Sequence, residues 1–338
     1  MSVAMLKLDP SLNGDIISHM PPNIIENILS RLYNWVTLPE LIFNFTLGNA
    51  SRNRNDRIVK FIDDVLSLHR GPICKFELSG DLCILNTGYI DKWILCLSRN
   101  AIQELILWPH PWLIANDELP SCLYSCELLN HLQLSFCTLR RPPLFASFNF
   151  LKSLLLYKVL FVGFSFENLI SRCPILEILK IEGFTSYNDF TIYAPKLKCL
   201  YFAVDFVPKK LPKTYYHMKS LDLNICFNDV HMVLMALCLS RSAPNLQELK
   251  INVIIYPNMH STAISRIRDG PEFSLNQLRN VKINRFGGWR RQLEFVEFLL
   301  SITPVLEKMS IYGYKDPTIT KGYPVYGARM LEVLMRFS

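Results

Sequence analysis

The chain repeats one pattern of apolar and variable positions along most of its length. The pattern is apolar, two variable residues, apolar, one variable residue, apolar, and it occurs ten times in 338 residues. The copies begin at Ile73, Ile102, Leu129, Leu151, Leu176, Leu197, Met218, Leu246, Leu278 and Leu306. Successive copies start about 26 residues apart on average, within the range of one class of stacked repeat. This regular spacing predicts a repeat array, since chance matches in an ordinary α/β domain would not keep one period.

The pattern assigns each position of a copy, numbered 1 to 6, to one side of a strand. Positions 4 and 6 are two residues apart, so they share one face of the strand, and position 1 lies in the turn that enters it. Positions 3 and 5 point to the opposite face. Stacking such strands in parallel buries a continuous core that no single copy could form. The expected fold is an α/β leucine-rich-repeat solenoid, with parallel strands on the concave face and helices and loops on the convex face.

The segments between the strands favour helices. Residues 166–173, 233–243 and 293–303 have helical spacing of apolar positions, and a proline follows each of them, which is a stop signal for a helix. Residues 55–68 predict a further amphipathic helix, expected to cap the open end of the array over the Ile73 copy. Its predicted apolar stripe is Ile58, Phe61, Ile62, Val65 and Leu68.

Composition narrows the class of protein. Half of the residues are hydrophobic and 19% are charged, which suits a large core. Apolar runs stay below the roughly 18 residues of a membrane span, and the N-terminal residues have no apolar signal core, so we expect a nuclear or cytoplasmic protein. The net charge of +7 comes without a basic stripe, which argues against nucleic-acid binding.

The chain offers little that resembles catalytic or metal-binding chemistry. Its ten cysteines lie mostly in apolar strings and are interpreted as reduced core residues. The closest pair, Cys122 and Cys126, has no second Cys or His pair at zinc spacing. The seven histidines are scattered, and nucleophile, phosphate-loop and dinucleotide motifs are not found. We therefore expect a protein that is not an enzyme and has no cofactor or metal.

Several segments resemble a known plant family. Residues 20–32, MPPNIIENILSRL, resemble the opening of an F-box, and residues 33–39, YNWVTLP, resemble its end. Residues 275–288, LNQLRNVKINRFGG, and residues 291–311 after them resemble the FBD region of plant F-box/FBD/leucine-rich-repeat proteins. The segments 68–73 and 89–99 are similar to that family's early repeats. The resemblance covers nearly the whole chain.

The resemblance implies four regions and a function. These are a partial F-box at 1–45, a connecting or capping helix at 46–71, leucine-rich repeats at 72–264, and an FBD-like continuation of the solenoid at 265–338. In that family the F-box docks on a Skp-type adaptor joined to a cullin scaffold, and the repeats hold a target for ubiquitin transfer. Carried onto this chain, the adaptor contacts are Pro21, Ile25, Ile28, Leu29 and Leu32.

The chain departs from the family inside the F-box. Leu32 passes directly to Tyr33, Asn34 and Trp35, without the helix and Ser-rich stretch that the family places between them. Two interpretations follow. The chain is a substrate-recognition subunit of an SCF-type ubiquitin ligase, or it is a non-catalytic interaction or decoy protein whose truncated F-box no longer docks the adaptor.

The unknown target protein is expected on the concave face. The outward positions 3 and 5 run from Glu104 and Ile106 in the second copy to Asn280 and Lys282 in the ninth, and they become more charged along the chain. Exposed apolar residues with a charged surround are typical of a partner site, although they also fit a bare solvent-facing sheet. The residues predicted to contact the target are Tyr157, Lys180, Tyr201 and Lys250.

Overall fold

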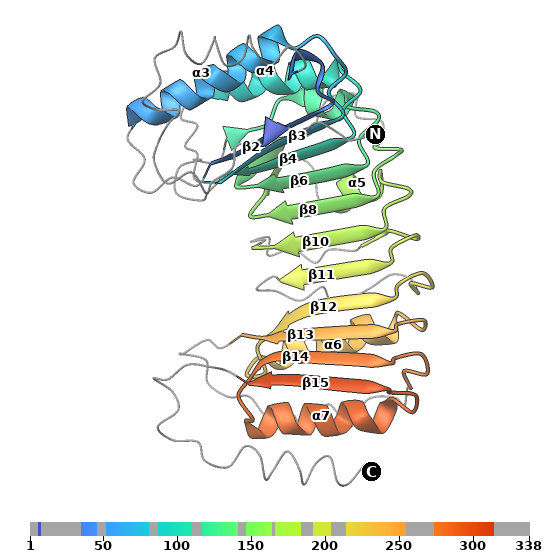
Figure 1. The fold of residues 1–338 in the computed structure, drawn as a ribbon. Coiled ribbons are helices and arrows are strands. Elements are labelled where there is room, and N and C mark those ends of the chain that lie inside the picture. The colour runs from blue at the N-terminus through green and yellow to red at the C-terminus, as the bar shows by residue number, and fades with distance from the viewer. Residues whose placement is uncertain are drawn as a thin grey trace. The chain divides into compact units, whose positions relative to one another are not determined.

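The computed structural model describes residues 6–7, 35–45, 52–80, 87–109, 117–140, 147–163, 166–183, 192–203, 214–254 and 274–313. The chain divides into two compact units, Met1–Ile175 and Leu176–Ser338. Each unit is built around a parallel sheet whose strands are joined by helices or loops (Figure 1). Both units therefore have the α/β architecture that the repeat pattern predicts.

The first unit contains a parallel sheet in which the strand order follows the chain, and a smaller second sheet. The main order is β1 (Leu6–Lys7), β2 (Glu40–Phe45), β3 (Lys75–Gly80), β4 (Glu104–Pro109), β6 (His131–Ser135) and β8 (Ser153–Tyr157). The second sheet is β5 (Asp117–Glu118), β7 (Cys137–Arg140) and β9 (Leu160–Val162). The helical elements are η1 (Trp35–Thr37), α3 (Arg52–Leu68), α4 (Thr87–Ser98), η2 (Ser121–Ser125) and α5 (Phe166–Ile170). Consecutive repeats thus lie side by side, as stacking requires.

The second unit repeats this layout. Its parallel strands are β10 (Ile178–Glu182), β11 (Cys199–Ala203), β12 (Ser220–Ile225), β13 (Glu248–Val253), β14 (Asn280–Phe286) and β15 (Lys308–Gly313). Its helices are α6 (Val230–Arg241) and α7 (Arg290–Ile302). The helices α5, α6 and α7 correspond to the three predicted ones, with α6 and α7 each beginning three residues earlier. The predicted FBD-like segment contributes β14 and β15 to the same sheet, with α7 between them in the chain.

One hydrogen-bond arrangement joins consecutive repeats within each unit. The carbonyl at position 2 accepts the N–H groups of positions 2 and 3 in the following copy, at 2.8 and 3.0 Å from Glu177 and at 2.9 and 2.9 Å from Lys219. The same pairing runs from Cys74 to the N–H groups of Gln103 and Glu104. Because both N–H groups find an acceptor, the turn into each strand has its backbone donors satisfied.

The core consists of positions 1, 4 and 6, as the pattern predicts. Leu176, Leu179 and Ile181 of one copy are at most 1% exposed, and the equivalent Leu278, Val281 and Ile283 are at most 2% exposed. At about 25 cal/mol per Å² of apolar surface, such a continuous column is the main source of stability in a stacked array.

The repeat array begins one copy earlier than predicted. Strand β2 pairs with β3 in register, Leu41 opposite Phe76, and the Pro39 carbonyl accepts the N–H groups of Cys74 and Lys75. Leu38-Pro39-Glu40-Leu41-Ile42-Phe43 is therefore a further copy of the pattern, within residues assigned to the partial F-box. Its Pro39 has no N–H to donate to a preceding repeat, which is tolerated near the edge of an array.

Helix α3 connects β2 to β3, and its buried stripe differs from the predicted one. Ile58, Ile62 and Val65 are buried as expected, but Leu68 is 56% exposed and Phe61 is only partly buried. Val59 and Leu66 are buried as well. The buried stripe is wider on one side because the helix packs against two neighbours. On β2, the Phe43 ring meets the Phe61 ring edge to face at 6.3 Å between centroids. On α4, the Trp93 side chain donates a hydrogen bond to the Asp63 carboxylate.

A left-handed turn ends several strands at the same repeat position. Counting on from the six-residue pattern, position 8 has positive φ at Gly80, Phe136 and Lys158 in the first unit, with values of 99°, 50° and 51°. In the second unit Gly183 and Arg285 occupy the same position, with φ of 65° and 56°. Glycine adopts this conformation at no steric cost, whereas other residues do so at a cost. After Phe136 and Lys158, this turn leads the chain toward β7 and β9 of the second sheet.

Candidate partner-binding face

The outward positions of the strands form one open face of the sheet in each unit. In β8, Ser153, Leu155 and Tyr157 are partly exposed between buried Leu154 and Leu156. In β10, Ile178 and Lys180 are exposed between buried residues in the same way. The predicted assignment of positions 3 and 5 to an outward face is confirmed in both units.

The face of the first unit has an ionic row beside two apolar residues, Ile106 and Leu155, that a glutamine separates. The ammonium of Lys75 lies 3.4 Å from the carboxylate of Glu104 and 3.8 Å from that of Glu77. Register places Ile106 opposite Glu77 on one side and Gln133 on the other, and Gln133 opposite Leu155. These ion pairs are partly exposed, so they contribute little stability and chiefly orient the charged side chains.

An aromatic cluster lies at the end of the strands in the first unit. The Trp108 and Tyr157 rings are 5.4 Å apart between centroids, and Phe136 meets Tyr157 edge to face at 4.9 Å. The Lys158 ammonium lies over two of these rings, 5.3 Å from the Phe136 centroid and 5.5 Å from that of Tyr157. These four residues, which we call the corner cluster, combine apolar surface with one exposed cation.

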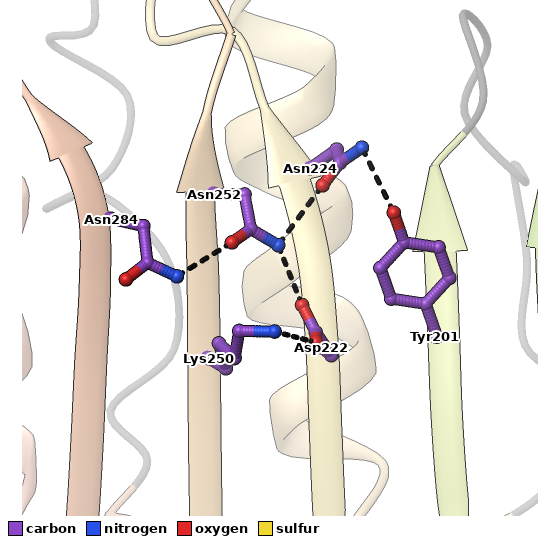
Figure 2. A network of polar contacts seen from close by, with 6 residues as sticks. All are labelled: Tyr201, Asp222, Asn224, Lys250, Asn252 and Asn284. Atoms are coloured by element: carbon purple, nitrogen blue, oxygen red, sulfur yellow. Dashed lines mark hydrogen bonds and ion pairs between the residues drawn. The ribbon is translucent and has the colours of Figure 1, made fainter. Parts of the chain in front are cut away.

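A polar network crosses four strands of the second unit (Figure 2). Asn284 donates to Asn252 at 2.7 Å, and Asn252 donates to Asn224 at 3.1 Å and to Asp222 at 2.7 Å. Asn224 donates to the Tyr201 hydroxyl at 3.4 Å, and Lys250 pairs with Asp222 at 2.5 Å. Each bond joins neighbouring strands, because the parallel register places equal repeat positions side by side. The side chains are therefore held in place before any partner arrives.

The environment of Tyr201 keeps its phenol protonated. Partial burial raises the pKa of Tyr201 above its ordinary value, and the nearby Glu182 carboxylate raises that pKa further, whereas the hydrogen bond from Asn224 lowers it. Burial likewise raises the pKa of the Cys199 thiol on the same strand. A protonated phenol that accepts from Asn224 still has its O–H available as a donor to a partner.

The structure brings three of the four predicted target contacts together. Lys180 lies opposite Tyr201 in the β10–β11 register, and Tyr201 is linked to Lys250 through Asn224, Asn252 and Asp222. Tyr157 belongs to the first unit, in the corner cluster. The predicted adaptor contacts Pro21, Ile25, Ile28, Leu29 and Leu32 lie outside the described residues.

Sequence reasoning missed the asparagine ladder and most of the corner cluster. Asn224, Asn252 and Asn284 all stand at position 7, one outward position beyond the six-residue pattern. Extending the pattern by one residue would have revealed the same amide in three successive copies of the second unit. For Phe136 and Lys158 no comparable signal exists, since their side chains meet only through the left-handed turn.

Three further properties of the described residues concern metal sites, membrane-spanning helices and disulfides. Across them, no group of three His, Cys, Asp or Glu side chains could hold a metal ion. Within the same ranges, no helix is long and apolar enough to cross a membrane. All nine cysteines that fall in these ranges are free.

Comparison with known proteins gives family matches along most of the chain. Residues 90–212 match the model described as the LRR repeats of the FBD-associated F-box protein At5g56370, and residues 268–311 match the FBD model. The F-box/FBD/LRR-repeat protein At1g13570 of Arabidopsis thaliana is 32% identical over 384 aligned positions, covering 88% of this chain and 91% of the relative. The putative F-box/LRR-repeat protein At4g15060 of the same plant is 33% identical, covering 55% of this chain and 45% of the relative.

Proposed function

Because this chain belongs to the F-box/FBD/LRR-repeat family of plant proteins, we propose that it is the target-binding subunit of an SCF-type ubiquitin ligase. In this role the repeat face holds a target protein in the nucleus or cytoplasm, and a Skp-type adaptor and cullin scaffold connect it to the subunits that transfer ubiquitin. The chain itself catalyses no reaction. Its relative carries the F-box, FBD and LRR-repeat designations together, which is the combination that this role requires.

The preorganised polar face of the second unit is the observation that carries target binding. Asp222, Asn252 and Lys250 are joined by bonds of 2.5 and 2.7 Å, and all three side chains are partly exposed. Ordering side chains at an interface costs about 0.5–1.5 kcal/mol each, so side chains that are already held avoid part of that cost.

The target-binding role is tested by proteins that copurify with the chain from plant cells. A variant with Tyr157 of the first unit and Lys180, Tyr201 and Lys250 of the second unit all changed to Ala should lose its target, because a few contact residues carry most of the affinity of an interface. A matched control changes three exposed helix residues, Lys60, Asp64 and Arg290, to Ala. Retention of every copurifying protein by the first variant would contradict binding through this face.

A second candidate function is that of a decoy, which binds a target without delivering it. The observation in its favour is the direct passage from Leu32 to Tyr33, where the F-box middle is missing. The alignment with the 32% identical relative spans 384 positions, more than the 338 residues of this chain, so the relative has residues without a counterpart here.

Adaptor binding separates the two candidates, and we expect it to be weak or undetectable. The helix predicted at 22–32 is too short to be stable alone in water, and its apolar stripe needs the missing helices as a packing surface. Loss of several anchors at about 1–3 kcal/mol each would remove measurable affinity.

The assay compares this chain with a version whose F-box middle is restored between Leu32 and Tyr33, using one purified Skp-type adaptor. We expect the restored version alone to bind tightly. Equal and tight binding by both would remove the decoy function and leave the ligase subunit.

A further inference from the structure

Two strained turns in the first unit carry large side chains where glycine would fit best. Position 8 is glycine at Gly80, but it is Phe136 after β6 and Lys158 after β8, both with φ near 50°. Side chains in this left-handed region are disfavoured, and strain of this kind is kept where the surrounding structure uses the side chain. The question is what Phe136 and Lys158 do that glycine would not.

Their side chains complete the corner cluster instead of joining the buried core. Phe136 is partly exposed and Lys158 is exposed, and the hydrogen bond from the Phe136 N–H to the Tyr157 carbonyl, at 2.9 Å, holds the two turns together. Among the described residues, the contacts of the Lys158 ammonium are ring faces and not carboxylates. Aromatic faces attract a cation without cancelling its charge, so this ammonium remains available to an anion.

The surface beside the cluster is apolar on one side and acidic farther away. Ile106 and Leu155 occupy the outward position two residues before Trp108 and Tyr157 on their strands, about 7 Å along the same face. Beyond them, Glu77 and Glu104 gather around Lys75. A partner's negative charge is therefore favoured at the corner cluster and disfavoured beside Glu77 and Glu104.

We propose that the corner cluster binds a partner segment that carries an acidic residue next to a large apolar residue. The acidic side chain pairs with Lys158 at the strand ends, and the apolar side chain packs on Trp108, Tyr157 and Leu155. The inference rests on the proposed target-binding function and specifies which chemistry on the target this part of the face recognises. A lysine at this left-handed turn is less favourable for folding than glycine. We infer that the lysine is kept because its side chain contributes to binding.

The test uses the full chain and a set of bead-displayed peptides, each with the same Gly/Ser flanks and one central pair. The four pairs are Phe-Glu, Phe-Lys, Ser-Glu and Ser-Lys. Display of many copies on one bead raises the apparent affinity of a weak single contact to a measurable level. The wild-type chain is expected to bind the Phe-Glu beads at least tenfold more tightly than the other three.

Three substitutions at one position separate binding from folding. Lys158→Gly relieves the turn and should abolish the Phe-Glu preference, while its midpoint of urea unfolding stays equal or rises. Lys158→Arg should keep the preference, and Lys158→Glu should move it to the Phe-Lys beads. Arg285→Gly relieves the same turn position in the second unit and should leave peptide binding unchanged.

Two outcomes overturn the proposal. One is a wild-type chain that does not distinguish the four peptide classes. The other is a Lys158→Gly variant that either binds like wild type or unfolds at lower urea, since the lysine would then serve stability. Neither outcome depends on the adaptor assay, so the proposed ligase role can fail or stand separately.

Discussion

Asn252 is the residue through which the ladder of the second unit can be tested most directly. Its amide makes three hydrogen bonds, to Asp222, Asn224 and Asn284, at 2.7, 3.1 and 2.7 Å. A net hydrogen bond contributes about 1 kcal/mol, and one to a carboxylate contributes more. The residue is partly exposed, so water replaces part of what is lost. Asn252→Ala should therefore lower the free energy of unfolding by about 2 kcal/mol.

The substitution Asn252→Asp sharpens the test. It keeps the acceptor for Asn284 but places a second carboxylate within hydrogen-bond distance of Asp222. Repulsion raises the pKa of the new carboxyl above that in the unfolded chain, so the folded state binds more protons. Stability then falls as pH rises through the unfolded value near 4, and the deficit relative to wild type should be largest at pH 7 and narrow toward about pH 4.

The assay is urea unfolding of both variants and of a matched control. Asn44 occupies position 7 of the first repeat and is exposed, so Asn44→Ala should change the free energy of unfolding by less than about 0.5 kcal/mol. If Asn252→Ala unfolds at the same urea concentration as wild type, the ladder contributes no net stability. If the deficit of Asn252→Asp does not change with pH, the new carboxylate does not face Asp222.

Two further predictions concern packing and pH. Phe43 is fully buried, so Phe43→Ala should lower the free energy of unfolding by about 4 kcal/mol. Phe61→Ala should lower it by about 2 kcal/mol because Phe61 is partly buried, and Leu68→Ala by less than about 0.5 kcal/mol because Leu68 is exposed. All three values are measured by urea unfolding. Equal losses at Phe43 and Phe61 would contradict the burial of α3 described above. The buried Tyr215 hydroxyl donates to the Ile192 carbonyl at 2.6 Å, and burial raises the pKa of Tyr215 to about 12. The folded pKa exceeds the unfolded value near 10, so the contribution of Tyr215 to the free energy of unfolding is fully present below pH 10. Above pH 10 it falls by up to about 1.4 kcal/mol per pH unit. Tyr215→Phe should have a lower free energy of unfolding than wild type at pH 8 and should lose less of it between pH 10 and 12. If the free energies of unfolding of variant and wild type fall in parallel over that range, ionisation of Tyr215 does not cause the loss.

The repeat pattern by itself determined the fold and the faces of the strands. Positions 4 and 6 must share a face because side chains alternate along a strand, and a regular period places equal positions beside one another. The burial of Leu179 and Ile181 and the exposure of Ile178 and Lys180 could therefore be predicted without coordinates. The proline after each helical segment predicted the end of that helix to within a few residues.

Pattern reasoning failed where one residue has two interpretations. Leu38 and Pro39 resemble the end of an F-box and also start a repeat, and only the pairing of β2 with β3 reveals the repeat. The stripe of α3 failed for a related reason. Helical spacing shows which residues share a face, but the neighbouring β2 and α4 determine how wide the buried part of that face is, and so leave Leu68 exposed.

The contacts of the candidate sites were decided by tertiary structure alone. Asn224, Asn252 and Asn284 are separated by 28 and 32 residues along the chain, and parallel register brings their amides within hydrogen-bond distance. Lys158 meets the rings of Phe136 and Tyr157 because its backbone takes a left-handed turn, which nothing in its residue type favours. A local sequence specifies the direction in which a side chain points, whereas its neighbours depend on how distant repeats stack.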